Sequence, residues 1–258
     1  MYYQQIRVVF NQAFFVGLIL LIVTMKQNIV VLSGAGVSAE SGLKTFRDSD
    51  GLWEEYSIME VATPEAWARN PELVLKFYNE RRAQMRSTKP NAAHIALAKL
   101  EDYFNVTVVT QNVDDLHERG GSTKVLHLHG KLNQSRSDKH PRFVYEIEGN
   151  EINMGDTCER GSQLRPNIVW FGEEVPMISP AIELIAKANI IIVVGTSLNV
   201  YPAAGLLYHA SYESRKYLID PAQNDGSVIY KLEHIRENAG TAVPKLVDQL
   251  IQEFESAN

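Results

Sequence analysis

Short, continuous runs of β-branched and aliphatic residues alternate with longer amphipathic stretches from Asn28 to the end of the chain. Such unbroken apolar runs are typical of parallel strands that are buried on both faces of a sheet. The expected strands cover residues 29–32, 106–110, 125–128, 190–194 and 217–219. Apolar residues recur near helical spacing in residues 64–86, 92–102, 180–188 and 243–253. The alternation predicts an α/β fold with a Rossmann-like, doubly wound parallel sheet.

Residues 133–163 interrupt this pattern, because they are polar and charged apart from an apolar run at 143–147. We interpret them as a small inserted lobe that is rich in β-structure. The sequence contains no internal repeat, which excludes a solenoid. We therefore expect one domain over residues 28–258, with this lobe inserted in it.

The first 27 residues form a hydrophobic extension, with an uninterrupted apolar run at 13–23. This run is shorter than the ~20 residues that a spanning helix needs, and no small-residue cleavage site follows it. Three interpretations remain open: a dispensable extension upstream of a true start at Met25, a membrane-proximal anchor, or an extra helix packed on the core. The first is favoured, because a buried-strand pattern follows Met25 directly.

Composition narrows the classes of partner. The chain has 258 residues, of which 45% are hydrophobic and 22% charged, as in ordinary globular proteins. A net charge of −6 disfavours nucleic acid as a partner, because nucleic-acid binding requires a basic surface. The single cysteine, Cys158, cannot form an internal disulfide. This cysteine usage favours a reducing, cytoplasmic location.

A glycine-rich turn follows the first expected strand. Gly34, Ala35 and Gly36 lie where a backbone can turn sharply and approach a phosphate group, which suggests a dinucleotide site. The next glycine is Gly42, so the spacing departs from the common G-x-G-x-x-G pattern. A simple turn between strand and helix remains an alternative.

Polar side chains follow the second expected strand. Gln111, Asn112 and Asp114 lie at its carboxyl end, where open α/β sheets bind ligands. Their amide and carboxylate groups suit ribose hydroxyls and a carboxamide, although they could also form only a turn.

Histidines are the candidates for a general base, because their pKa lies near neutrality. His129 follows the third expected strand and precedes a glycine. His127 lies two residues earlier on the same side and is the alternative base. His94 and His117 lie in helical patterns, where we expect structural roles.

Five motifs in this chain resemble the signatures of the sirtuins, a family of NAD-dependent protein-lysine deacylases. They are GAGVSAESG through TFR at 34–47, TQNVD at 110–114, LHG at 128–130, IVWFGE at 168–173 and GTS at 195–197. They occur in the family's order, and the resemblance extends from Asn28 to the C-terminal helix. It implies NAD as cofactor and acylated lysine side chains of proteins as substrate.

The resemblance also implies which residues bind NAD. Asp220 stands where many relatives have asparagine, and Ala239 would offer backbone contacts near the adenine. The full set is Gly34, Ala35, Gly36, Phe46, Arg47, Gln111, Asn112, Asp114, Gly195, Thr196, Ser197, Asp220 and Ala239.

By the same resemblance, His129 and Asn112 are the catalytic residues. The acyl oxygen attacks NAD as nicotinamide leaves, and His129 then activates a ribose hydroxyl, which gives free lysine and O-acyl-ADP-ribose. The substrate peptide pairs with the backbone of the IVWFGE motif by strand addition. Without the resemblance, this motif could be only an edge strand with buried aromatics. The peptide-pairing residues are Val169, Trp170, Phe171 and Gly172.

Tyr78 and Arg81 lie three residues apart on an expected helix and share one face. On a helix without any family resemblance, we would expect the face that carries Tyr78 and Arg81 to be exposed to solvent. Here the pair resembles the Tyr-x-x-Arg motif of class III sirtuins, and Ala62 resembles the small residue that widens their acyl pocket. An arginine with a tyrosine hydroxyl suits a buried carboxylate, so succinyl-lysine or malonyl-lysine is favoured over acetyl-lysine.

The chain departs from the family at its zinc site, which most sirtuins build from two cysteine pairs. Ser137 and His140 stand at the first pair, and Cys158 stands alone near the second. Since structural zinc needs four ligands, we expect a lobe without metal. This lobe would be loose, or would be stabilised instead by the apolar run that comprises Phe143, Val144, Tyr145 and Ile147.

Three other functions remain as alternatives. The NAD site could serve a general lysine deacetylase or a mono-ADP-ribosyltransferase, or the protein could bind NAD or ADP-ribose without catalysis. The presence of His129, Asn112 and Asp114 disfavours the last alternative.

Overall fold

The computed structural model describes residues 26–43, 52–53, 56–149, 151–196, 203–222 and 229–257. The apolar run at 13–23 and the predicted NAD-binding residues Phe46, Arg47 and Ser197 lie outside these ranges.

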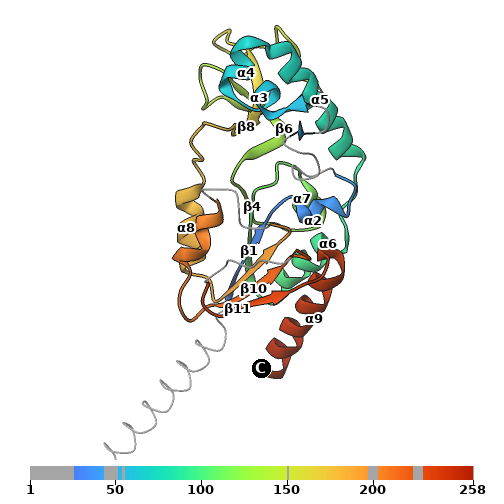
Figure 1. Cartoon of the computed structure of the whole chain (residues 1–258), viewed down its shortest axis with the longest axis vertical. Helices are drawn as coiled ribbons and strands as arrows, with labels where there is room; N and C mark the ends of the chain where they lie inside the picture. Colours follow the sequence, from blue (N-terminus) through green and yellow to red (C-terminus); the bar gives the residue numbers. More distant parts are fainter. Residues whose placement is uncertain are drawn as a thin grey trace, which may run out of the picture.

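A six-stranded parallel sheet forms the centre of the protein, in the order β11-β10-β9-β1-β4-β5 (Figure 1). The chain runs outward from β1 through β4 to β5 and later returns to the other side of β1 with β9. The order therefore reverses beside β1, and ligands of such sheets bind at the carboxyl ends of the strands at this point. The strands are β1 (Asn28–Ser33), β4 (Asn105–Thr110), β5 (Val125–His127), β9 (Ile190–Val194), β10 (Arg215–Ile219) and β11 (Leu232–Ile235).

Helices cover both faces of this sheet, which confirms the predicted doubly wound fold. Side chains alternate along a strand, so Val31 packs on one face of the sheet while Val30 and Leu32 pack on the other. The first face is covered by α6 (Ala92–Lys99) and α9 (Ala239–Ala257), and the second by α8 (Ile178–Ala186) and η2 (Ala203–His209).

A second lobe lies beyond the carboxyl edge of the sheet (Figure 1). It combines helices with an antiparallel sheet of order β7-β6-β8, around a core that includes Phe77, Leu132 and Trp170. Its elements are α3 (Ile58–Val61), α4 (Pro64–Arg69), α5 (Pro71–Ser87), β6 (Gly130–Ser137), β7 (Val144–Glu146) and β8 (Leu164–Ile168). Five short elements complete the described fold: α2 (Gly36–Ala39), the paired strands β2 (Leu52–Trp53) and β3 (Tyr56–Ser57), η1 (Leu100–Asp102) and α7 (Leu116–Arg119).

Some predicted boundaries were wrong. The helix expected over 64–86 is two helices, because Asn70 caps the second one by accepting a hydrogen bond from Leu73 N at 3.1 Å, and Pro71 fills its first position. The helix expected over 92–102 ends as the separate 3₁₀ turn η1, and α9 begins at Ala239 rather than at residue 243. The antiparallel sheet of the second lobe begins before, and ends after, the range 133–163.

The prediction that the apolar run supports the inserted lobe in place of zinc was also wrong. Val144 is 42% exposed, and the other three residues of that run are only partly buried. Ile152 is buried instead, and its backbone N–H and carbonyl both hydrogen-bond to the Asn79 side chain, at 3.0 and 3.1 Å. Cys158 Sγ donates to Ser137 Oγ at 3.4 Å. Over the described ranges, no three His, Cys, Asp or Glu residues are grouped so that they could hold a metal ion.

Among the described helices, none combines the length and the apolar character needed to cross a membrane.

Candidate active site at the carboxyl edge of the sheet

Two glycine-containing loops interlock where the strand order reverses. Gly36 N donates to the carbonyl of Gly195 at 2.8 Å, and Gly195 has a φ of +64°. A Cβ atom on Gly195 would lie 2.2 Å from Val37 N, and one on Gly34 would lie 2.6 Å from Thr196 Cβ. The loops after β1 and β9 can therefore approach each other only because these positions lack side chains.

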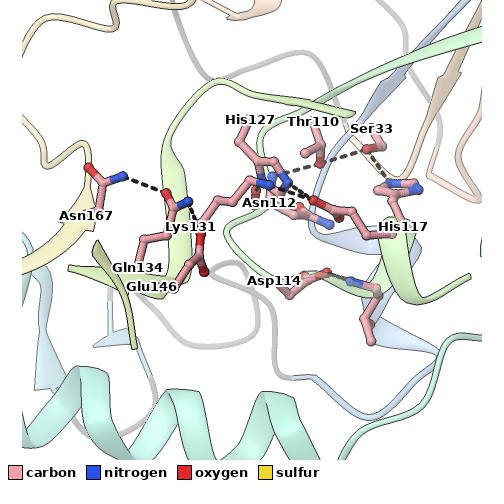
Figure 2. Close-up of polar contacts among 12 residues, drawn as sticks. Ser33, Thr110, Asn112, Asp114, His117, His127, Lys131, Gln134, Glu146 and Asn167 are labelled. Atoms are coloured by element: carbon pink, nitrogen blue, oxygen red, sulfur yellow. Dashed lines mark hydrogen bonds and ion pairs between the residues drawn. The ribbon is translucent and has the colours of Figure 1, made fainter. Parts of the chain in front are cut away.

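A buried chain of hydroxyl groups supports the loop after β4 (Figure 2). Ser33 Oγ donates to Thr110 Oγ1 at 2.9 Å, and Thr110 Oγ1 accepts a hydrogen bond from Asn112 N at 3.0 Å. His117 Nε2 lies 2.8 Å from Ser33 Oγ, and the His117 ring packs on the His94 ring with centroids 4.8 Å apart. Burial lowers the pKa of His117 to about 3 and that of His94 to about 4, so both rings are neutral. Their positions fit the structural roles expected for them.

Ser38 joins the two predicted polar residues Asn112 and Asp114. Asn112 Nδ2 donates to Ser38 Oγ at 3.0 Å, and Ser38 Oγ donates to Asp114 Oδ2 at 3.1 Å. Burial raises the pKa of Asp114, although hydrogen bonds from Leu116 N and Ser38 oppose the shift. Sequence reasoning missed Ser38, although it lies inside the first motif.

The hydrogen bonding of His129 is what a general base requires. Its Nδ1 lies 3.0 Å from the carbonyl oxygen of Gln111, which can only accept, so Nδ1 carries the proton and Nε2 keeps a lone pair. Burial lowers the pKa of His129, and the hydrogen bond to Gln111 opposes this shift only partly. The ring is therefore neutral at pH 7 and able to accept a proton. The next residue, Gly130, has to be a glycine, because a Cβ atom at this position would lie 1.9 Å from Asn167 O.

The alternative base is His127, but both of its ring nitrogens already have hydrogen-bond partners within the protein. Its Nδ1 lies 3.0 Å from the carbonyl oxygen of Asn112, and its Nε2 lies 2.9 Å from Glu118 Oε1. This geometry favours His129 as the base.

The predicted peptide-pairing segment follows β8 and is held by hydrogen bonds within the protein. Val169 N donates to the carbonyl of His129 at 2.9 Å, and Phe171 N donates to the carbonyl of Ala62 at 3.0 Å. Trp170 N donates to Glu173 Oε2 at 2.8 Å, and Gly172 follows with a φ of +90°. Three consecutive N–H groups are thus engaged, so a substrate strand would have to use the carbonyl groups or displace these bonds. The segment connects the base to the predicted acyl pocket.

Tyr78, Arg81 and Ala62 are all buried, at 0%, 7% and 2% exposure. Trp170 Nε1 donates to the Tyr78 hydroxyl at 3.0 Å. Burial raises the pKa of Tyr78, so it remains a neutral hydroxyl despite the opposing effects of the Trp170 hydrogen bond and of the charges on Arg165 and Arg81. The alternative that Arg81 lies on a solvated helix face is therefore wrong.

A cluster of two arginines and one carboxylate was missed by sequence reasoning. Arg165 binds Glu173 through both terminal nitrogens, at 2.8 and 3.0 Å, and Arg136 Nη2 lies 3.0 Å from Glu173 Oε1. The Arg165 guanidinium lies 3.2 Å from the centroid of the Trp170 ring. This cluster fixes the Trp170 indole that bonds to Tyr78. Glu173 closes the IVWFGE motif and could have been singled out, whereas nothing in the sequence marked Arg165.

The other predicted cofactor residues that fall in the described ranges also lie near this edge. Gln111 Nε2 donates to Thr196 Oγ1 at 3.2 Å, which joins the loops after β4 and β9. Asp220 directly follows β10 and accepts a hydrogen bond from Ala222 N at 2.8 Å. Ala239 is buried at the start of α9.

Comparison with known proteins agrees with this geometry. An NAD-dependent protein deacylase of Helicobacter pylori (strain ATCC 700392 / 26695) is 52% identical over 226 residues, which cover 88% of this chain and 98% of that protein. One of Bacteroides thetaiotaomicron is 50% identical over 230 residues, covering 87% and 98%. A solved Sir2 homologue in complex with NAD superposes with a TM-score of 0.80 at 39% identity, covering 90% of this chain and 92% of the other. A Sir2 complex with a p53 peptide and NAD⁺ gives 0.70 at 30% identity, covering 91% and 96%. The family model described as Sir2 family matches residues 34–202, and this chain therefore belongs to the Sir2 family.

Proposed function

We propose that this NAD-dependent protein deacylase removes short acidic acyl groups, succinyl or malonyl, from lysine side chains in preference to acetyl groups. The observation that carries the proposal is the burial of the Arg81 guanidinium on the same helix face as the neutral hydroxyl of Tyr78. A guanidinium binds a carboxylate through forked hydrogen bonds, and a neutral phenol can donate one more. Ala62 is a small residue in the same buried hydrophobic cluster as Tyr78.

The residues at the carboxyl edge of the sheet fit NAD. The interlocked glycine loops lie where the strand order reverses, which is where such sheets bind a pyrophosphate. Asn112 and Asp114 offer an amide and a carboxylate to a carboxamide and to ribose hydroxyls. NAD, when bound, supplies nicotinamide as the leaving group and ADP-ribose as the acceptor of the acyl group.

The protein's own residues orient the reactants and move one proton. His129 Nε2 accepts a proton from a ribose hydroxyl, while the Gln111 carbonyl holds the opposite ring nitrogen in its protonated form. Thr110 and Ser38 fix the main chain and the side chain of Asn112. The segment from Val169 to Phe171 connects the base to the acyl pocket and is the proposed contact for the substrate peptide.

The proposal is tested by incubating the purified protein with NAD and matched acetyl, malonyl, succinyl and glutaryl peptides, with products identified by mass. We expect faster turnover of the succinyl and malonyl peptides. Equal or faster turnover of the acetyl peptide would make the protein a general deacetylase. Attachment of ADP-ribose to a protein without loss of an acyl group would favour ADP-ribosyl transfer.

The cytoplasmic location suggested by the single cysteine is also a proposal. Cell fractionation with an antibody to the chain tests it.

A further inference from the structure

Two histidines hold neighbouring carbonyl groups of the loop after β4. His129 Nδ1 contacts Gln111 O, and His127 Nδ1 contacts Asn112 O, each at 3.0 Å (Figure 2 shows His127 and Asn112). Because carbonyl oxygens only accept, each Nδ1 carries a proton. The two rings differ at Nε2. His127 Nε2 lies 2.9 Å from Glu118 Oε1, whereas His129 Nε2 forms no hydrogen bond with any residue that the structure describes.

The partners of His127 require a proton on both ring nitrogens. An ionised carboxylate only accepts, and a neutral imidazole has a single N–H, so it cannot donate to Asn112 O and Glu118 Oε1 together. Lys131 Nζ also donates to Glu118 Oε1 at 2.9 Å, which favours the ionised carboxylate. Burial opposes ionisation of Glu118, but the hydrogen bond and charge of His127 and the hydrogen bond of Lys131 outweigh it and lower the pKa of Glu118 to about 2. Each ring nitrogen of His127 therefore faces an acceptor, Asn112 O at Nδ1 and Glu118 Oε1 at Nε2.

Four ionisable groups surround His127. Glu118 and His117 come from α7, Lys131 from β6 and Asp114 from the loop after β4. Burial keeps His117 neutral by lowering its pKa to about 3. His127 and Lys131 share Glu118 Oε1, each at 2.9 Å.

We propose that His127, which donates from both ring nitrogens to Asn112 O and to Glu118 Oε1, is a positioning residue that fixes the main chain of Asn112 for deacylation. Thr110 Oγ1 already holds Asn112 N, and His127 holds the carbonyl at the other end of the same residue. The preceding carbonyl, that of Gln111, sets the tautomer of the base His129. Loss of the His127 proton would place a lone pair against an acceptor and release either Asn112 or Glu118. The role rests on the proposed function of His129 as base.

The protonation state can be measured without any substrate, by nitrogen NMR of the full chain labelled at its histidines. We expect both ring nitrogens of His127 to show protonated shifts near neutral pH. Its signals are assigned by their loss in His127→Gln. In Glu118→Gln, the new amide can donate to Nε2, so His127 should become the neutral Nδ1–H form. A neutral His127 in the parent protein would overturn the proposal.

Kinetics with NAD and an acyl-lysine peptide test the positioning role. Removing a hydrogen bond from a charged group costs about tenfold or more, so His127→Phe should lower kcat by at least this factor while KM for NAD stays near the parent value. Glu118→Gln should keep kcat near the parent value, because the ring can still donate to Asn112 O from Nδ1 and accept from the new amide at Nε2. His209→Gln, at an exposed histidine of η2, is the control and should match the parent.

Parent-like kcat in a folded His127→Phe, or a loss of kcat in Glu118→Gln as large as that in His127→Phe, would contradict the role. If His127→Phe does not fold, the kcat of Glu118→Gln and the nitrogen shifts decide. A parent protein that turns over no acyl peptide would refute the proposed function, and the nitrogen shifts would then still decide the state of His127.

Discussion

Replacing Arg81 by methionine separates an acidic-acyl deacylase from a general deacetylase. Arg81 is only 7% exposed, so a substrate carboxylate paired with it would be removed from water. Leaving one member of such a pair buried and unpaired costs roughly 2–4 kcal/mol. We therefore expect Arg81→Met to lower kcat/KM for a succinyl peptide by roughly 30- to 1,000-fold. Turnover of the acetyl peptide should stay the same or rise, since acetyl carries no charge.

The assay measures kcat/KM for succinyl and acetyl peptides of one sequence, at saturating NAD. Lys76→Met is the matched control, because Lys76 is a cation on the same helix whose side chain is 64% exposed. It should leave both substrates unaffected. Tyr78→Phe should act in the same direction as Arg81→Met but more weakly, by about 1 kcal/mol, because it removes a hydroxyl rather than a charge. Equal losses on both peptides in Arg81→Met, or no loss on either, would refute the reasoning.

Four further outcomes are expected. His129→Ala should bind NAD normally in calorimetry but lose about 10²- to 10⁴-fold in turnover, and parent-like turnover would shift attention to another base. In the folded protein, burial lowers the pKa of His94 to about 4 and that of His117 to about 3, so below about pH 6.5 the unfolded chain binds more protons than the folded one. The melting temperature should therefore fall as the pH drops from 7 towards 4. A melting temperature that stays constant over this range would contradict the neutral burial of the two histidines. Elemental analysis after chelator washing should find no stoichiometric zinc. A chain that begins at Met25 should fold and turn over substrate, whereas failure to fold would assign a packing role to the preceding residues.

The sequence favoured His129 over His127 through the glycine that follows it and through the sirtuin resemblance, and the tertiary structure supplied the physical reason. Each ring binds a carbonyl of the loop after β4, but only His127 also contacts Glu118. Glu118 comes from a helix between two strands, and its approach to His127 depends on how that helix packs. The same applies to Arg165, whose contacts with Glu173 and Trp170 follow no local periodicity.

The sequence by itself determined five of the six central strands and the positions of the motifs, but it did not predict β11. The centres of β1 and β9 are buried on both faces, so they form continuous apolar runs that the sequence pattern shows clearly. The ends of these strands then mark the ligand-binding edge, where the predicted cofactor residues in the described ranges lie. By contrast, β6 and β8 carry polar residues, and their pairing depends on partners distant in sequence. Tertiary packing therefore decided the second lobe and the burial of Arg81, because contacts between distant segments leave no periodic signal in the chain.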